Sequence, residues 1–200
     1  MAHDHPHDHE HPHDHSPSPQ GLPAADASVR RDRPTDTPAI GIVQAEVFKE
    51  AYAARVPPEV VERFEPVAFA RAWRAALEQP PAGAHALFVA LAGPQVVGLL
   101  AVGPTQDPDD PGDRGEVTVL AVHPAGRRQG HGSRLLNAGA DHLHAAGAAS
   151  MAAWVLVDDE MTRAFLTGAG LAPDGAFRDR VVSPDGQVVR EVRLTCMLGS

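Results

Sequence analysis

The stretch Val119–Leu136, VLAVHPAGRRQGHGSRLL, changes from a strand pattern to a helix pattern within a few residues. Its apolar first part is typical of a strand, which Pro124 ends, and the paired leucines at its close lie on the apolar stripe of a helix. Gly130 and Gly132 stand where this helix begins. Glycines at such a point let a ligand approach the backbone N–H groups closely. The stretch therefore predicts a strand–turn–helix unit with a binding turn.

The start of this helix predicts an anion site. The first turn of a helix leaves about four N–H donors unpaired and carries a partial positive charge, a setting that binds phosphate. Arg127, Arg128 and Arg134 add positive charge there, although the whole chain has a formal charge of −9. We therefore expect a di- or polyphosphate ligand. A P-loop is excluded because no Gly-Lys-Ser/Thr follows, and the dinucleotide fingerprint needs three spaced glycines.

The same residues resemble the signature of the GNAT family of N-acetyltransferases. That signature is Val-x-Pro at the end of a strand, then Arg/Gln-x-x-Gly-x-Gly/Ala, then a helix with paired leucines. Here it reads Val122-His123-Pro124, Arg127-Arg128-Gln129-Gly130-His131-Gly132 and Leu135-Leu136. The resemblance in element order extends from about residue 40 to residue 198. It implies an N-acetyltransferase with acetyl-CoA as its cofactor.

The resemblance also implies which residues hold this cofactor. Backbone N–H groups of the turn are expected to bind its pyrophosphate, and the end of the preceding strand is expected to border its pantetheine arm. A free N–H on that strand would polarise the thioester carbonyl, as developing oxyanion charge requires. The cofactor-binding residues expected in this way are Leu120, Ala121, Val122, Arg127, Arg128, Gln129, Gly130, His131, Gly132 and Ser133. We expect the His131 side chain to face solvent.

Glu116 is the candidate general base. An amine must be neutral before it attacks a thioester, and a carboxylate can take its proton, often through water. Glu116 begins the strand that leads to Val122. The resemblance implies the base role, because a Glu at the matching position acts as the base in the histone-acetylating branch of the family. The alternative is a solvated charge at the end of a strand.

The residue that usually protonates the departing thiolate in this family, a Tyr, is missing. The sequence 154–156, WVL, matches the family pattern, but Phe165-Leu166 stands where Phe-Tyr is usual. The only tyrosine, Tyr52, is far away in the sequence. Either water protonates the thiolate, which is a tolerable leaving group because a thiol has a pKa of about 8.5, or the chain binds acyl-CoA without turning it over well. We expect activity.

The order of the expected elements predicts an α/β fold with a mixed sheet. The family resemblance implies that this sheet is GNAT-like, mixed and mostly antiparallel, and flanked by helices. Trp73 is expected to pack in the core. The N-acetyltransferase domain is expected to span residues 39–198. Within it, the expected helices are 40–55, 59–78 with a break at Pro66, 132–146 and 160–169, and the expected strands are 85–91, 96–102, 116–122 and 150–157, followed by a last hairpin around 183–186.

Residues 1–38 are expected to form a disordered His/Asp/Pro-rich tail and linker, because their composition cannot bury a core. Histidine occupies every odd position from 3 to 15. Neutral imidazoles bind zinc, nickel or copper, so we expect adventitious binding of a divalent metal to the tail and no metal site in the domain. The alternatives are a solvated tail without a metal role, a tag, and a protein whose function lies in the tail.

Composition excludes several classes of protein. No apolar run approaches the roughly 20 residues of a membrane helix, and the N-terminus lacks a signal-peptide pattern, so we expect a cytoplasmic protein. The negative charge argues against a nucleic-acid partner. A single cysteine, Cys196, excludes an intrachain disulfide framework and a multi-cysteine zinc site. It is expected in the core, and a covalent acyl-cysteine route is the alternative.

The expected partner is an amine acceptor, a primary amine of a small molecule or peptide that attacks the thioester directly; a homodimer is a further option. The loop 103–114 carries Asp107, Asp109, Asp110 and Asp113, which we hypothesise to attract a cationic amine. The alternative is a solvated acidic loop. The rival function is a catalytically weak acyl-CoA-binding sensor or regulatory module on the same fold.

Overall fold

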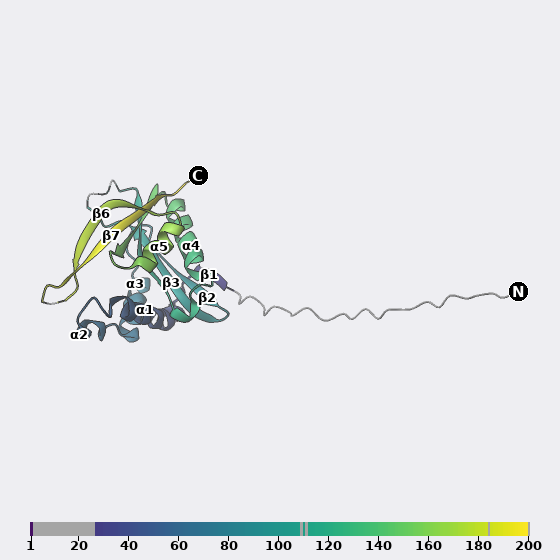
Figure 1. The fold of residues 1–200 in the computed structure, drawn as a ribbon, viewed down its shortest axis with the longest axis horizontal. Coiled ribbons are helices and arrows are strands. Elements are labelled where there is room, and N and C mark those ends of the chain that lie inside the picture. The colour runs from purple at the N-terminus through teal and green to yellow at the C-terminus, as the bar shows by residue number, and fades with distance from the viewer. Residues whose placement is uncertain (2–26, 109, 111, 184, 200) are drawn as a thin grey trace.

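The computed structural model describes residues 1, 27–108, 110, 112–183 and 185–199 (Figure 1). Its centre is a seven-stranded sheet in the order β1-β2-β3-β4-β5-β7-β6. The strands are β1 (Ala27–Arg31), β2 (Ala86–Ala92), β3 (Gln95–Pro104), β4 (Arg114–Val122), β5 (Ser150–Leu156), β6 (Ala172–Val181) and β7 (Val188–Met197). Strands β4 and β5 run parallel, and the other neighbouring pairs are antiparallel.

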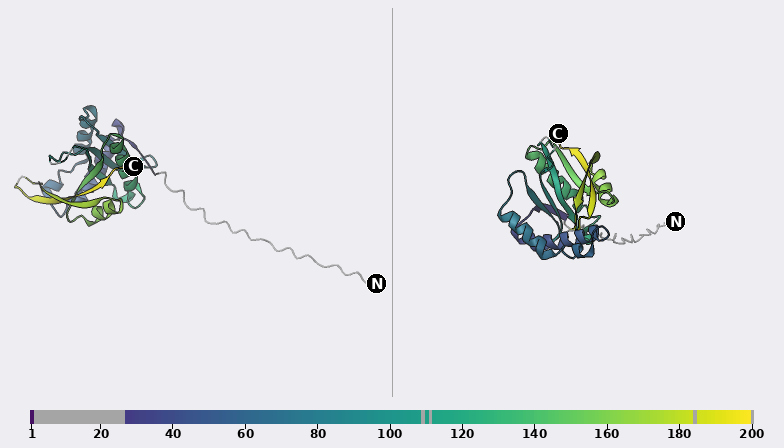
Figure 2. Two further views of the ribbon diagram at one scale, coloured as in Figure 1. Left: turned by 90° about the horizontal axis from the view of Figure 1, so that it is seen from above. Right: turned by 90° about the vertical axis from the view of Figure 1, so that its left-hand side faces the viewer.

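Helices cover both faces of the sheet. They are α1 (Thr37–Tyr52), α2 (Pro58–Val61), α3 (Pro66–Glu78), α4 (His131–Ala145) and α5 (Glu160–Gly168), with short 3-10 turns η1 (Pro34–Asp36) and η2 (Pro124–Gly126). Figure 2 shows α1–α3 on one side of the molecule, away from α4 and α5. In the residues that the structure describes, no helix has the length and apolar character needed to cross a membrane.

Two apolar clusters hold these helices to the sheet. Neighbouring residues of β3 show the alternation, because Leu100 packs on the α4 side and Leu99 on the α1 side, each 0% exposed. Leu135 of α4 and Ile40 of α1 lie in the respective clusters. Burial of one such side chain contributes roughly 1.5–3 kcal/mol. Trp73 packs against the α1 cluster, as expected, and its Nε1 donates a hydrogen bond of 2.6 Å to Gln44.

The start of the folded domain differs from the prediction. Residues 27–38 were expected in the linker, but they form β1, η1 and the first residues of α1. Strand β1 pairs antiparallel with β2, and the Arg30 guanidinium binds the Asp36 carboxylate at 2.7 and 3.0 Å. A short, charged edge strand lacks the apolar alternation that identifies a strand from sequence. The expected tail up to residue 26, with its histidines, lies outside the described residues apart from Met1.

The other expected elements are confirmed within a few residues. The break at Pro66 is the boundary at which α3 begins, since proline is favoured in the first turn of a helix. The turn at Gly93 joins β2 to β3, and the residues around 183–186 join β6 to β7. These turns have local sequence signals, so their positions follow from the residues themselves.

Candidate active site

The first turn of α4 presents unpaired N–H groups. Gly130 is the N-cap residue, with φ +79° and no side-chain cap. The first hydrogen bond of the helix runs from the Arg134 N–H to the Gly130 carbonyl at 3.1 Å. Within the described part of the chain, the N–H groups of residues 128–133 have no hydrogen-bond acceptor. Such a turn binds anions, and the glycine N-cap places no side chain over it.

Arg128 holds the strained backbone conformation in the turn before α4. Its φ is +64°, and among the described residues no other non-glycine residue has a positive φ. The left-handed conformation costs a non-glycine residue roughly 1–2 kcal/mol. With Gly130 also left-handed, two of three consecutive residues bend the chain into the type of turn whose successive N–H groups form a concave anion site. The strain thus lies where the sequence predicts phosphate binding.

Strands β4 and β5 separate beside this turn. Their pairing covers only Arg114–Val117 and Ser150–Ala153, so the rest of β4, including Leu120–Val122, has no partner on the β5 side. Gly132 lies next to this gap, because a Cβ built on it would lie 3.2 Å from Phe165 and 3.8 Å from Val122. The uncapped turn and an unpaired strand edge are therefore neighbours, as the family resemblance implies for residues that bind the pyrophosphate and pantetheine parts of acetyl-CoA.

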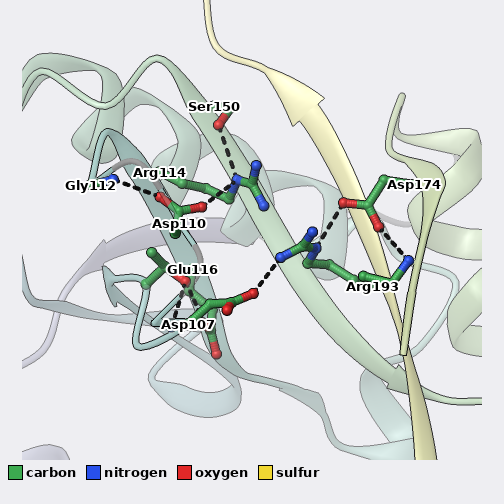
Figure 3. A network of polar contacts seen from close by, with 10 residues as sticks. Asp107, Asp110, Gly112, Arg114, Glu116, Ser150, Asp174 and Arg193 are labelled. Carbon is green, nitrogen blue, oxygen red and sulfur yellow. Dashed lines mark hydrogen bonds and ion pairs between the residues drawn. The ribbon is translucent and has the colours of Figure 1, made fainter. Parts of the chain in front are cut away.

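Glu116 lies on the sheet face opposite α4. It pairs with Gly103 and Ala152 of the neighbouring strands, and the next residue, Val117, belongs to the α4-side cluster. The Glu116 side chain is buried, at 7% exposed, and one carboxylate oxygen accepts a hydrogen bond of 3.2 Å from the Thr105 hydroxyl (Figure 3). Glu116 is thus an oriented, desolvated carboxylate rather than a solvated charge at a strand end.

A cavity of about 660 Å³ lies on the same face. Glu116 does not line it, but Thr105 connects Glu116 to the lining residue Asp107. Trp154 and Arg193 face each other across β5 and β7, and their neighbours in sequence pack on the α4 side. Both therefore project from the face that carries Glu116. The charged and aromatic residues that line the cavity are Asp107, Asp110, Arg114, Trp154, Phe177, Arg178 and Arg193. A concave site of this volume is ordinary for a small ligand.

The aspartates of the β3–β4 loop are paired with arginines. Asp107 accepts from Arg193 at 2.5 Å, and Asp110, whose side chain is 1% exposed, lies 3.1 Å from Arg114 (Figure 3). Both carboxylates are thus members of ion pairs, and the hypothesis that this loop attracts a cationic amine stays a prediction. Asp113 is exposed, and Asp109 lies outside the described residues. The partner of Asp107 is distant in sequence, whereas Arg114 lies only four residues after Asp110.

His131 is not solvent-facing, which corrects the sequence-based expectation. Its residue is 1% exposed, and neither ring nitrogen has a hydrogen-bond partner in the described residues. Burial, with a smaller contribution from the positive charge of Arg134, lowers the pKa of His131. The first helical position of α4 points this side chain into the interior, under η2 and close to Gly126. His131 thus contributes a backbone N–H to the turn and a neutral ring to its packing.

Arg127 is anchored by helix α1. Its Nε donates to the Val122 carbonyl at 3.1 Å, and its two terminal nitrogens donate to the Glu50 carboxylate at 2.8 and 2.6 Å. One turn earlier on α1, Glu46 lies 2.6 Å from His123. The expected cofactor-binding residue Arg127 therefore joins the turn to α1 through its side chain.

The positions considered for acid or nucleophile chemistry lie in packed surroundings. Leu166, at the expected tyrosine position, is 2% exposed in the α4-side core. Tyr52 packs against Phe48 and Phe64 with ring centroids 5.8 and 5.7 Å apart, and burial raises its pKa. Cys196 is partly buried against the core, and burial raises the pKa of its thiol.

A model of the acetyltransferase (GNAT) family matches residues 48–170. The chain belongs to this family. The matched region contains Glu116, the β4–β5 gap and the uncapped start of α4. No curated protein matches the sequence.

Solved structures share the fold. The structure of yncA from Salmonella typhimurium, described as an acetyltransferase with its cofactor acetyl-CoA, has a TM-score of 0.63 at 18% identity and covers 87% of this chain and 95% of its own. An N-acetyltransferase from Staphylococcus aureus Mu50 has a TM-score of 0.65 at 16% identity, and the match covers 87% of this chain and 99% of that one. The PaiA N-acetyltransferase from Thermoplasma acidophilum in complex with coenzyme A has a TM-score of 0.62 at 14% identity, and the match covers 83% of this chain and 97% of that one. The predicted α/β fold is confirmed, and the predicted cofactor is the one named for yncA.

Asp107 and Asp110 of the cavity were singled out from the sequence, but its tryptophan and arginines were missed. Trp154 was considered there only as part of the stretch that matches the family pattern, and no role was assigned to Arg178 or Arg193. A signal was present, because Arg193 alternates with apolar Val192 and Leu194 in the final strand, which indicates a polar face opposite the core. The sequence does not show that this face meets the β3–β4 loop.

Proposed function

We propose that this protein is an acetyl-CoA-dependent N-acetyltransferase that moves an acetyl group to a primary amine of a small molecule or peptide by direct attack. The observation that carries the proposal is the uncapped, glycine-started helix α4 beside the unpaired end of β4. Family membership and the cofactor of the yncA structure support it. We propose a cytoplasmic enzyme, in keeping with the sequence-based expectation.

The residues of the α4 turn fit the proposed cofactor. The N–H groups of residues 128–133 have no competing acceptor among the described residues, and they would bind the pyrophosphate. Leu120–Val122 would border the pantetheine arm along the unpaired edge of β4. Arg127 would hold the turn in place through Val122 and Glu50. When bound, acetyl-CoA supplies the acetyl group as a reactive thioester.

Glu116 is proposed as the general base. Its buried carboxylate lies on the face that carries the cavity, where the acceptor amine would enter. The Thr105 hydroxyl occupies one lone pair of one carboxylate oxygen and fixes the orientation of the group. The remaining lone pairs can accept a proton from the amine, directly or through water, which leaves the amine nitrogen neutral for attack.

Water is proposed to protonate the departing thiolate. Leu166 has no proton to donate, and it is enclosed in the core. Tyr52 is packed among phenylalanines of α1 and the segment before α3. A thiolate whose conjugate acid has a pKa of about 8.5 leaves without a dedicated acid. The missing tyrosine is therefore compatible with turnover.

The test is a screen of primary amines with acetyl-CoA, in which free thiol and the acetylated product are both measured. We expect thiol release with at least one amine, and the Glu116→Gln variant should lower kcat by about 10²-fold or more at unchanged acetyl-CoA affinity. The control is Glu59→Gln, an exposed residue of α2. Acetyl-CoA binding without thiol release for any amine would contradict the proposal and favour a sensor.

A further inference from the structure

We infer that the acceptor is a zwitterionic small molecule, a primary amine with a carboxylate on the same skeleton, whose carboxylate is bound by Arg178 in the cavity beside Glu116. The inference rests on the proposed function, because it names the acceptor class of that site. It follows from how charge is distributed around the cavity and from which donors there lack a partner.

One end of the cavity carries a positive charge that its neighbours do not balance. Arg178 and Arg180 share one carboxylate, Glu191, through contacts of 2.6 and 3.3 Å. The Glu191 side chain is 5% exposed, whereas that of Arg178 is 40% exposed and lines the cavity. Two guanidinium groups on one buried carboxylate leave one net positive charge on the group as a whole, and Arg178 is the member of the pair that lines the cavity.

Arg178 is held in place with donors to spare. Its Nε donates to Glu191, and its guanidinium carbon lies 4.4 Å from the ring centroid of Trp154. Its two terminal nitrogens donate no hydrogen bond to any described residue, and a planar guanidinium stacked on an aromatic ring retains these donors in a fixed plane. This geometry suits a carboxylate, which a guanidinium binds through two parallel hydrogen bonds.

The other end of the cavity has the opposite charge. Arg193 lies between two carboxylates, Asp107 at 2.5 Å and Asp174 at 2.7 Å, so carboxylates outnumber guanidinium groups in this set of contacts. Thr105 links it to the proposed base, because its hydroxyl donates to Glu116 and accepts from the Asp107 N–H at 3.3 Å. The ammonium form of an amine is favoured at this end, next to the carboxylate that would deprotonate it.

The two ends together match a zwitterion. Trp154 joins them, since Arg178 and Arg193 both lie over its ring, at 4.4 and 5.4 Å from the centroid. A ligand that spans the ring would place its carboxylate at Arg178 and its amine towards Glu116. A polyamine would place a second positive charge against Arg178, and a peptide N-terminus would place a neutral amide there. Both are therefore disfavoured.

The experiment compares matched acceptors on the same skeletons: amino acids with small, branched and aromatic side chains, their carboxamides, and the corresponding amines without the carboxyl group. We expect kcat/KM for the best acid to exceed that for its carboxamide by about tenfold or more, which is the size of one charge-assisted hydrogen-bonded contact. In Arg178→Gln this ratio should fall towards one, and Arg178→Lys should restore part of it. Equal use of acid and carboxamide would overturn the inference.

Arg190→Gln is the matched control. Arg190 is another arginine of the β6–β7 hairpin, paired with Asp179 and stacked 4.7 Å over Phe177, and it does not line the cavity. Its loss should leave the ratio of acid to carboxamide unchanged. A ratio that falls equally in both variants would overturn the inference, because the effect would then belong to the hairpin as a whole.

A binding arm separates this inference from the proposed function. N-acetyl amino acids and their carboxamides are titrated into the full chain with coenzyme A present, and tryptophan fluorescence is recorded, with Trp154→Phe identifying the reporter. Preferential binding of the acids, lost in Arg178→Gln, together with no thiol release from any amine would contradict the proposed function alone. Thiol release without any preference for acids in either arm would contradict the inference alone.

Discussion

Arg127 and Glu50 form a bidentate ion pair, at 2.8 and 2.6 Å, that joins the turn before α4 to helix α1. The remaining donor of Arg127, its Nε, binds the Val122 carbonyl at the end of β4. The hydrogen bond to Arg127 lowers the pKa of Glu50, so the pair stays ionised at mildly acid pH. A single arginine thereby ties together the three segments that surround the proposed cofactor site.

We predict that Glu50→Gln weakens acetyl-CoA binding severalfold, measured by calorimetry, because the turn loses its anchor on α1. The unfolding free energy should change by less than about 1 kcal/mol, since both partners are partly exposed. Glu59→Gln is the control for loss of one surface charge. An unchanged dissociation constant in Glu50→Gln would show that the turn keeps its conformation without the ion pair.

The buried ring of His131 predicts a pH-dependent stability. Burial lowers the pKa of His131 in the folded state, so the unfolded chain binds more protons as the pH falls below about 6.5. Stability is therefore complete above that pH and declines below it, by at most about 1.4 kcal/mol per pH unit. In His131→Leu the decline between pH 7 and pH 5 should be smaller, as measured by urea unfolding.

His144→Gln is the control for this measurement, because His144 is exposed on the last turn of α4. Its pH profile should follow that of the unsubstituted chain. If His131→Leu kept the full decline as well, the buried ring would not be the titrating group, and the carboxylates would have to account for the profile.

The N-cap glycine of α4 predicts a defect in cofactor binding that can be separated from strain. Gly130 and Gly147 lie at opposite ends of α4 with φ of +79° and +93°. Alanine at either position should cost roughly 1–2 kcal/mol of stability for the left-handed backbone. Only Gly130→Ala adds a methyl group at the anion-binding turn, so it alone should weaken acetyl-CoA binding, by about tenfold or about 1.4 kcal/mol.

Calorimetry and thermal unfolding on both variants check this prediction. Equal losses of affinity in Gly130→Ala and Gly147→Ala would indicate that general destabilisation, and not the turn, controls binding. A loss of stability without any loss of affinity in Gly130→Ala would place the pyrophosphate elsewhere.

Cys196 is predicted to be dispensable for turnover. Burial raises the pKa of its thiol, so little thiolate is present near neutral pH, and the thiolate is the nucleophilic form. Cys196→Ala should keep kcat within about twofold of the unsubstituted value. Mass spectrometry of the chain after incubation with acetyl-CoA should show no acetyl adduct at this position, and an adduct that the acceptor amine removes would establish a covalent route instead.

The sequence alone was sufficient for features that depend on neighbouring residues. The strand end at Pro124, the glycine-started helix after it and the hairpin turns all have their signals within a few positions. The placement of Glu116 on a strand next to the proposed cofactor turn follows from the same local pattern. Propensity, periodicity and turn chemistry act over this range, so these predictions agree with the structure.

Tertiary structure decided the features whose partners are far apart in the chain. Arg193 meets Asp107 across 86 positions, and Arg127 meets Glu50 across 77, and neither pairing has a local signal. Strand β1 exists because β2 offers an edge to pair with. His131 is buried because the packing of η2 and α4 encloses its side chain. Long-range burial and ion pairing, which depend on the folded arrangement of several elements, thus determine the chemistry of the proposed acceptor cavity.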